Sequence, residues 1–590
     1  LRGGAVAAIG KISRGELLRK PTRQPGTREP RVGMRPTPTL PSLLWNDPDE
    51  RARSVRVSPV VASDLALDRI VHAIAGSSRY EREVRDILYE LCPDPRTIAY
   101  RQDILEDLLH HPALSRQLRD LLPEIADLSS RNTKWKGDSA MMAVLDRLSE
   151  LESFVQCVDR LRSILESAPS LRAQGLILLR DAVTTLAEDP EVVSLRAELP
   201  SLHELVAETT SVTIGLNLGA GLQPESATIT SLNRYQFKGP RSLLGRLLPG
   251  SSGGKFGQTP LREVGPVNLR RGSQLFKDLQ DLLESASAPL AQALEQYQNV
   301  SVAPLSALVG ALAFFTGACT LAERLGATNT EYCRPTIAAR EDRLFQVQDM
   351  TNLALRLQLL DNGAAPVVTN DADFNLQSRV LILTGPNRGG KTTYCRALGQ
   401  TQVMFQAGLF VACSSAHLSP VDGIWTHFPL PEADQPGAGH LDEEVQRLRR
   451  IFDEASASSL ILLNEPLTST SERGALAIAA DLVRALQLLG ARVLLVTHLH
   501  DLARMIPELN ASGPVGSGVR SLVAEASGNG DLVRGTFRII PGLPVGRSFA
   551  TEIARQHGLT FDQLRHMLSR RTPHPLPEAQ ETTQPDDDEA

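Results

Sequence analysis

One stretch of the sequence, RVLILTGPNRGGKTTYCRAL from residue 379 to 398, limits what the chain can fold into more than any other. An apolar run, Val380–Leu383, is followed by a glycine-rich turn and then by a segment of helical character. From Gly385 to Thr392 the turn has the spacing Gly-x-x-x-x-Gly-Lys-Thr, which is typical of a phosphate-binding loop between a strand and a helix. The sequence therefore predicts an α/β domain that contains a P-loop.

Such a loop binds phosphate mainly through its backbone. Glycine allows the backbone to approach phosphate oxygens because it has no Cβ to block the contact. The N–H groups of residues 388–392 and the start of the helix supply partial positive charge. Lys391 adds a full charge near the β- and γ-phosphates, and the Thr392 hydroxyl is placed to bind Mg²⁺. We expect ATP and Mg²⁺ to bind at this loop, which consists of Gly385, Pro386, Asn387, Arg388, Gly389, Gly390, Lys391, Thr392 and Thr393.

The bulk composition is that of a globular protein with several domains. A chain of 590 residues is too long for a single core, so two to four domains are expected. The net charge of −6 gives no global positive field, so any binding of nucleic acid must use a local patch. The six cysteines are scattered, with no CxxC pair and no cysteine–histidine cluster. This pattern predicts neither a disulfide framework nor a zinc site, and it favours the reducing cytoplasm.

The pattern along the chain predicts an α+β multidomain fold. Residues 1–60 are rich in Pro, Gly and Arg, so we expect a flexible N-terminal extension, with a basic nucleic-acid arm as the alternative. Apolar spacing of three and four residues predicts helices over about 61–210, and helices resume over about 273–325; together they predict an all-α core region within 61–335 that carries an insert. Residues 336–560 alternate short apolar runs with helical segments, as in an α/β domain with a mainly parallel sheet. Residues 561–590 read as an acidic, disordered tail.

Two further features concern the ends and the membrane. Met34 is a candidate natural start, which would leave residues 1–33 outside the natural protein. Residues 299–322 carry no charge and are long enough to cross a bilayer. Pro304, two glycines and the lack of basic flanks argue against a membrane span, and a helix buried on all sides has the same composition. We expect a buried helix and no membrane partner.

A change of period near residue 211 marks an insert in the helical region, over about 211–272. SVTIGLNLG and SATITSLN alternate with a period of two, which predicts a β-hairpin. Residues 234–271 then hold eight Lys or Arg against Glu263 alone, with Tyr235, Phe237 and Phe256 among them. This charge suits contact with a phosphate backbone, and the aromatics suit base stacking; a solvated flexible loop is the alternative. The candidate DNA-contacting residues are Arg234, Lys238, Arg241, Arg246, Lys255, Arg262, Arg270 and Arg271.

A second segment with candidate site residues lies further along the chain. The apolar run Leu460–Leu463 predicts a buried strand, and Asn464 and Glu465 stand at its end. Phosphoryl transfer to water needs a group that orients the water, and a glutamate at a strand end facing the P-loop suits that role. We expect Glu465 to be catalytic, with a solvated loop glutamate as the alternative.

Several of these segments resemble the MutS family of ATPases. TGPNRGGKTTY resembles the family's phosphate loop, TGPNxGGK(S/T)T, and SLILLNEP falls where the family carries its second nucleotide motif. VLLVTHLHDLA is similar to its TH-x-H/F-E-L segment, and DPRTIAYRQDILEDLLHHPAL to the start of its helical core. The resemblance spans about residues 61–560. It implies a core and lever region followed by an ABC-type ATPase domain, which uses ATP to control the binding of mismatched or branched DNA in repair or recombination.

The resemblance also implies roles for single residues. His498 matches a histidine that senses the γ-phosphate, although a structural histidine is the alternative. Asn464 stands where the family has an aspartate that, with the Thr392 position, holds Mg²⁺. The amide keeps a carbonyl acceptor but loses a negative charge, so we expect slow hydrolysis. Gly439 and His440 stand where a second subunit offers Ser-Thr to the nucleotide, which implies a homodimer.

The family also has an N-terminal domain that reads mismatches with a Phe-x-Glu wedge. The Phe-x-Glu in this chain, at residues 452–454, lies in the ATPase segment, so we expect that domain to be lacking and branched or structured DNA to be preferred. Two other classes stay open. An ABC-type transporter ATPase is disfavoured because there is no LSGGQ-like stretch, and an ATP-binding scaffold with little or no hydrolysis is favoured by Asn464.

Overall fold

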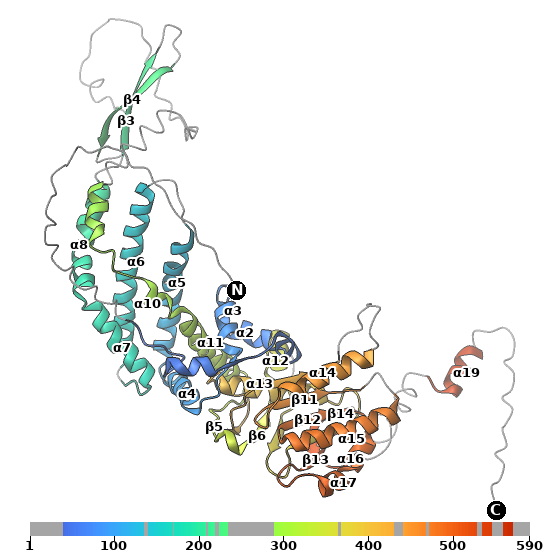
Figure 1. Ribbon diagram of the computed structural model, residues 1–590. Coiled ribbons are helices and arrows are strands. Elements are labelled where there is room, and N and C mark those ends of the chain that lie inside the picture. Colours follow the sequence, from blue (N-terminus) through green and yellow to red (C-terminus); the bar gives the residue numbers. More distant parts are fainter. Residues whose placement is uncertain are drawn as a thin grey trace, which may run out of the picture. The chain divides into compact units, whose positions relative to one another are not determined.

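A computed structural model describes residues 39–134, 140–168, 170–207, 211–218, 224–233, 288–363, 367–429, 440–467, 471–527, 534–544 and 559–569. All of them belong to one compact unit, residues 38–590. Within these ranges the protein combines a helical region with two larger β-sheets (Figure 1). The architecture is therefore α+β, as the sequence predicts.

The end of the segment expected to be flexible is part of the fold. It holds η1 (Pro48–Arg53), β1 (Val55–Arg56) and the start of α1 (Pro59–Asp64). Trp45 is buried, and the guanidinium of Arg101 lies 4.4 Å from the centre of its ring. Arg101 Nε also donates to the carbonyl of Leu44 at 2.7 Å. The prediction of a flexible extension is wrong for residues 39–60, because its few apolar side chains find partners that are distant in sequence.

Amphipathic helices make up the region that follows. The first long one, α4, begins at a proline whose preceding residue, Asp94, accepts a hydrogen bond from the N–H of Thr97 at 2.8 Å. Helices α5, α6 and α7 then pack side by side (Figure 1). The helices are α2 (Leu67–Ala75), α3 (Glu81–Leu88), α4 (Pro95–His110), α5 (Pro112–Lys134), α6 (Ala140–Glu166), α7 (Gln174–Ala187) and α8 (Pro190–Ala207), with the short η2 (Ser78–Tyr80) and β2 (Glu90–Leu91) between them.

The uncharged stretch folds as α10 (Ala303–Ser306) and α11 (Val309–Gly326). Helix α11 packs against α2, α3, α4 and α5. Within the described ranges, Ala303–Gly326 is the one helical segment apolar and long enough to cross a membrane, and 72% of its most apolar window is buried inside the protein. Gly317 allows the closest approach, since a Cβ there would lie 1.9 Å from the carbonyl oxygen of Ile74. The packing matches the expected buried helix.

The predicted hairpin is present. β3 (Ser211–Leu218) and β4 (Pro224–Asn233) pair antiparallel. The eight basic residues expected to contact DNA follow it, between 234 and 271, and they lie outside the described residues.

The larger sheet has the order β10-β11-β12-β8-β13-β14. Its strands run parallel except β14, which pairs antiparallel with β13 at one edge. They are β8 (Val380–Thr384), β10 (Ile424–His427), β11 (Leu460–Asn464), β12 (Arg492–Val496), β13 (Val519–Ser527) and β14 (Arg534–Pro541). A smaller sheet has the order β5-β9-β6-β7 and consists of β5 (Thr336–Ile337), β6 (Phe345–Met350), β7 (Asn370–Phe374) and β9 (Ser415–Leu418).

Alternate residues of the buried strands enter two different cores, because successive side chains point to opposite faces. In β8, Leu381 and Leu383 join the core shared with the helical region, whereas Val380 and Ile382 join a second core on the other face. The remaining elements are η4 (Arg340–Asp342), α12 (Leu353–Asp361), α13 (Lys391–Gln406), α14 (His440–Glu454), α15 (Glu472–Leu489), α16 (His500–Arg504), α17 (Ile506–Ser512) and α19 (Phe561–Ser569). Helix α19 corrects the expectation of a disordered tail for its nine residues.

Helix α13, which begins at the P-loop lysine, also connects the sheet to the helical region. Arg396 Nε donates to the carbonyl of Asp64 at 2.8 Å, and Gln406 Nε2 donates to the carbonyl of Cys92 at 2.9 Å. Just after the helix, Gly408 has a φ of +77°, and a Cβ there would lie 2.2 Å from Cβ of Arg101. The chain can pass α4 at this point only because residue 408 is glycine.

Replacing Gly408 by Ala should therefore destabilise the protein by about 2–4 kcal/mol, the sum of the left-handed backbone cost and the displacement of Arg101. Gly76→Ala is the matched control, because Gly76 has a φ of +63° but no atom lies within 4 Å of the position that its Cβ would take. Gly76→Ala should lower the free energy of unfolding by only about 1–2 kcal/mol, because it carries the backbone cost alone. Urea unfolding of both variants measures the difference, and equal losses would show that the chain after α13 is not in close contact with α4.

Candidate functional site

The glycine-rich turn lies between β8 and α13, as the sequence predicts. Gly385 and Gly390 have φ values of +137° and +89°, which side chains rarely permit. A Cβ on Gly385 would lie 2.7 Å from Cβ of Ala524 on the neighbouring strand β13. The turn is thus held tightly against the sheet, with its backbone at the carboxyl end of the central strand.

Lys391 is the first residue of α13, and its side chain is buried. Its Nζ donates to the carbonyl oxygens of Gly385 and Pro386, both at 3.0 Å, and lies 3.7 Å from Oε1 of Glu465. Burial lowers the pKa of the Lys391 ammonium below its usual value, and the charge of Glu465 partly offsets this shift. The ammonium is therefore held at the turn by one carboxylate and two dipoles.

Glu465 directly follows β11, and its backbone is fixed to the neighbouring strand. Its N–H donates to the carbonyl of Val496 in β12 at 2.8 Å, and its φ is +54°. Its Oε1 lies 3.0 Å from Nε2 of His498. This hydrogen bond is the main cause that lowers the pKa of Glu465, with Lys391 acting in the same direction and burial opposing it. Three residues from separate segments of the sequence thus meet at one carboxylate oxygen.

Thr392 and Asn464 also come together. The Thr392 hydroxyl donates to Oδ1 of Asn464 at 3.2 Å, and Asn464 is buried at the end of β11. A hydroxyl and an amide oxygen are both ligand types that Mg²⁺ accepts. Among the described residues, no group of three or more Asp, Glu, His or Cys side chains could hold a metal ion. Thr392 and Asn464 themselves offer only neutral oxygens to a cation at this position.

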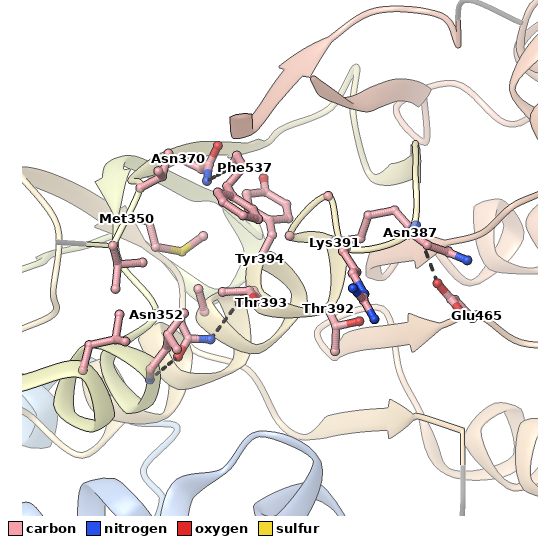
Figure 2. A pocket seen from close by; sticks show the side chains of 18 residues that line it. Met350, Asn352, Asn370, Asn387, Lys391, Thr392, Thr393, Tyr394, Glu465 and Phe537 are labelled. Atoms are coloured by element: carbon pink, nitrogen blue, oxygen red, sulfur yellow. Dashed lines mark hydrogen bonds and ion pairs between the residues drawn. The ribbon is translucent and has the colours of Figure 1, made fainter. Parts of the chain in front are cut away.

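A cavity of 440 Å³ opens beside the turn. Figure 2 shows Lys391, Thr392 and Glu465 on one side of it and Met350, Tyr394 and Phe537 on the other. The far wall is largely apolar and consists of Met350, Leu355, Leu359, Val367, Val368, Tyr394, Ala397 and Phe537. One end of the cavity thus offers positive charge and hydrogen-bond donors, and the other offers a surface for a flat apolar group.

Sequence reasoning misses Phe537, one of the two aromatic residues in this wall. Phe537 has a φ of +63° and is half exposed, although it belongs to β14. Asn370 holds the strand in this shape, since its Nδ2 donates to the carbonyl of Phe537 at 3.0 Å and its Oδ1 accepts from the N–H of Ile539 at 2.6 Å. The only signal in the sequence is an aromatic residue in a short late strand, which is too common to mark a site.

The predicted contact with a second subunit is described only in part. His440 is the first residue of α14, and Gly439 lies outside the described residues. Further along α14, Oε1 of Glu444 accepts from the N–H of Leu467 at 2.6 Å and lies 3.3 Å from Nε2 of the buried His427. Burial lowers the pKa of His427. Helix α14 is thus bound directly to the turn that follows Glu465.

Two family models match the chain. The MutS2 N-terminal domain matches residues 93–328, and MutS domain V matches residues 381–559. The fold and the site together define a protein in which a P-loop on a mainly parallel sheet is joined to a helical region. The chain is a divergent member of the MutS family.

Its relatives include proteins with two different names. It is 27% identical over 444 residues to the DNA mismatch repair protein MutS of Granulibacter bethesdensis, covering 70% of this chain and 46% of the relative. It is 26% identical over 466 residues to the protein of the same name from a Synechocystis species, covering 74% and 51%. The Endonuclease MutS2 of Thermus thermophilus is 31% identical over 200 residues, covering 34% and 25%. The chain thus spans about a quarter to a half of the length of these relatives.

Proposed function

We propose that the protein binds ATP with Mg²⁺ and uses binding and hydrolysis to control its grip on mismatched or branched DNA, in mismatch repair or recombination. The observation that carries the ATP part is the meeting of Lys391, Glu465 and His498 beside the P-loop. The DNA part is supported by the family and by the relatives named for DNA mismatch repair.

In this proposal, the N–H groups of the turn and the Lys391 ammonium bind the β- and γ-phosphates. Lys391 is suited to this because its charge is already removed from water, where an anion would be attracted more strongly. Glu465 stays ionised, since His498 and Lys391 lower its pKa, and it accepts a hydrogen bond from the attacking water. His498 keeps that carboxylate in place and faces the terminal phosphate.

Thr392 and Asn464 are the residues that would hold Mg²⁺, and their paired oxygens fit such an ion. The ion would neutralise charge on the phosphate oxygens. Asn464 brings no charge of its own to the site, unlike an aspartate. The proposed hydrolysis is accordingly slow.

The apolar end of the cavity suits the adenine base. Phe537 offers a ring face at the cavity wall, and stacking of a base on an aromatic side chain contributes about 1–3 kcal/mol. The wall residues Val367 and Met350 would cover the other parts of the base. The cavity therefore accounts for both ends of a nucleotide.

We also propose two binding partners for the protein, namely a second copy of the chain and DNA. A homodimer would bring the start of α14, with Gly439 and His440, to the nucleotide of the other subunit, and free N–H groups at a helix start suit a phosphate. The basic residues between 234 and 271 would contact the DNA backbone. We place the protein in the cytoplasm.

One rival function keeps the same ligand, namely a scaffold that binds ATP without appreciable hydrolysis. The neutral Asn464 favours it, and it differs from the proposal in turnover alone. The transporter ATPase is not favoured, because the family models and relatives belong to MutS and MutS2 proteins.

Two neighbouring substitutions should move ATP turnover in opposite directions. Glu465→Gln removes the carboxylate that orients water, so kcat should fall about 100-fold while ATP still binds. Asn464→Asp adds a negative charge at the metal position, so turnover should rise and the Mg²⁺ concentration for half-maximal rate should fall. Steady-state assays with and without duplex, mismatched and four-way DNA measure both.

An Asn464→Asp rate that is unchanged or lower would contradict the role given to that residue. A wild-type protein that binds ATP tightly but shows no turnover with any DNA would favour the scaffold. Stimulation by one DNA form would identify the substrate.

Neutralising four of the basic residues, Arg241, Arg246, Arg270 and Arg271, should weaken the salt dependence of DNA binding. Each lost phosphate contact reduces the slope of log K against log salt by about 0.9, so the slope should fall by about 3–4. Arg69, Arg82 and Arg96, which are exposed on the helical region, provide control substitutions. An unchanged slope in the first variant would leave the segment without a role in DNA binding.

A further inference from the structure

Two cysteines from distant parts of the sequence lie against each other. Cys333 lies between α11 and β5, and Cys413 lies between α13 and β9. Their sulfur atoms are 3.4 Å apart. The segment between them in the sequence includes the P-loop and the whole of α13. No motif in the sequence indicates this pair, because the two residues are separated by 80 positions.

The backbone holds both cysteines at one peptide group. The carbonyl oxygen of Val411 accepts from the N–H of Cys333 and from the N–H of Cys413, each at 3.0 Å. The N–H of Val411 in turn donates to the carbonyl of Cys333 at 3.0 Å. The closeness of the sulfurs therefore follows from the path of the chain and not only from side-chain rotation.

The residues on either side fix the same arrangement. The rings of Tyr332 and Phe410 pack with their centres 4.7 Å apart, one position before the Cys333–Val411 bridge. On the other side, Arg334 forms an ion pair with Asp103 of α4 at 2.7 Å. Cys333 is thus held between an aromatic contact and an ion pair.

The two thiols differ in access and in acidity. All six cysteines lie in the described part of the chain, and Cys333 is the one that is partly exposed, whereas Cys413 is buried. The hydrogen bond from Cys413 lowers the pKa of the Cys333 thiol, and the same hydrogen bond raises the pKa of Cys413. The thiolate is the reactive form of cysteine. Cys333 is therefore the thiol with which an oxidant would react first, because it is both more accessible and more acidic.

We propose that Cys333 and Cys413 are a redox-sensitive pair that forms a reversible intramolecular disulfide when the protein meets a peroxide. The Cys333 thiolate attacks one peroxide oxygen, the O–O bond breaks, and Cys333 becomes a sulfenic acid as hydrogen peroxide yields water. The Cys413 sulfur then attacks the Cys333 sulfur, and the second oxygen leaves as water. Two thiols and one peroxide thus give one disulfide and two waters.

The movement that this needs is small. The sulfurs must approach from 3.4 Å to the length of a disulfide bond, a change of about 1.4 Å. A cytoplasmic disulfide of this kind would be transient and reversed by cellular thiols. While it lasts, it would join the connection after α11 to the connection after α13, and so restrict the unfolded chain on both sides of the P-loop.

Oxidation of the full-length protein with hydrogen peroxide tests the proposal. Thiols counted after denaturation should fall from six to four, and peptide mapping should show residues 333 and 413 cross-linked within one chain. The melting temperature should rise by several degrees, and dithiothreitol should reverse both changes. Cys395→Ser, at a buried position on α13, should leave the cross-link intact.

Cys333→Ser and Cys413→Ser should each abolish the cross-link. The two variants should differ in how fast dimedone labels them after oxidation, because dimedone reacts with a sulfenic acid. In Cys413→Ser, peroxide leaves a sulfenic acid on Cys333, and dimedone traps it. In Cys333→Ser, the buried Cys413 is the thiol that remains, and its labelling by dimedone should be at least about tenfold slower. Six thiols after oxidation of the wild type, a cross-link between two chains, or equal labelling of both variants would overturn the proposal. None of these readouts depends on ATP or DNA, so the result is independent of the proposed function.

Discussion

The candidate site is organised around one buried charge, the Lys391 ammonium, and the groups that surround it. A buried ammonium is costly unless it is paired, and here the carboxylate of Glu465 and two carbonyl oxygens of the turn accompany it. These partners come from different strands, since the turn follows β8 and Glu465 follows β11. β12 lies between those strands and provides both the carbonyl that fixes Glu465 and, just beyond its end, His498. The parallel order of the sheet is thus what assembles the site.

The same region is tied to the rest of the protein by two direct routes. Helix α13 starts at Lys391 and donates hydrogen bonds to the helical region through Arg396 and Gln406. Helix α14 is bound through Glu444 to the N–H of Leu467, two residues after the carboxylate. These contacts connect the turn both to the helical region and to α14, the helix that begins at His440.

Much of this could be predicted from the sequence, because the relevant signals are local. The P-loop spacing, the buried run before Glu465 and the helical periodicity each depend on neighbouring residues, and the corresponding elements lie where they are expected. Phe537 could not be predicted, because its exposure arises from a left-handed backbone that Asn370, distant in sequence, stabilises. That residues 39–60 are part of the fold could not be predicted for a similar reason, because Trp45 packs against Arg101, a distant residue on α4. In both places the conformation is determined by partners that are distant in the sequence, and the local sequence pattern does not reveal them.

Equilibrium binding of ATP and of AMP to the wild-type protein, with Mg²⁺ present, tests most directly whether the turn around Lys391 binds terminal phosphates. ATP should bind about 100-fold more tightly than AMP, because the β- and γ-phosphates would gain charge-assisted hydrogen bonds from the ammonium and the turn. Lys391→Ala should remove most of that difference. Equal affinities for the two nucleotides in the wild type would contradict the central claim.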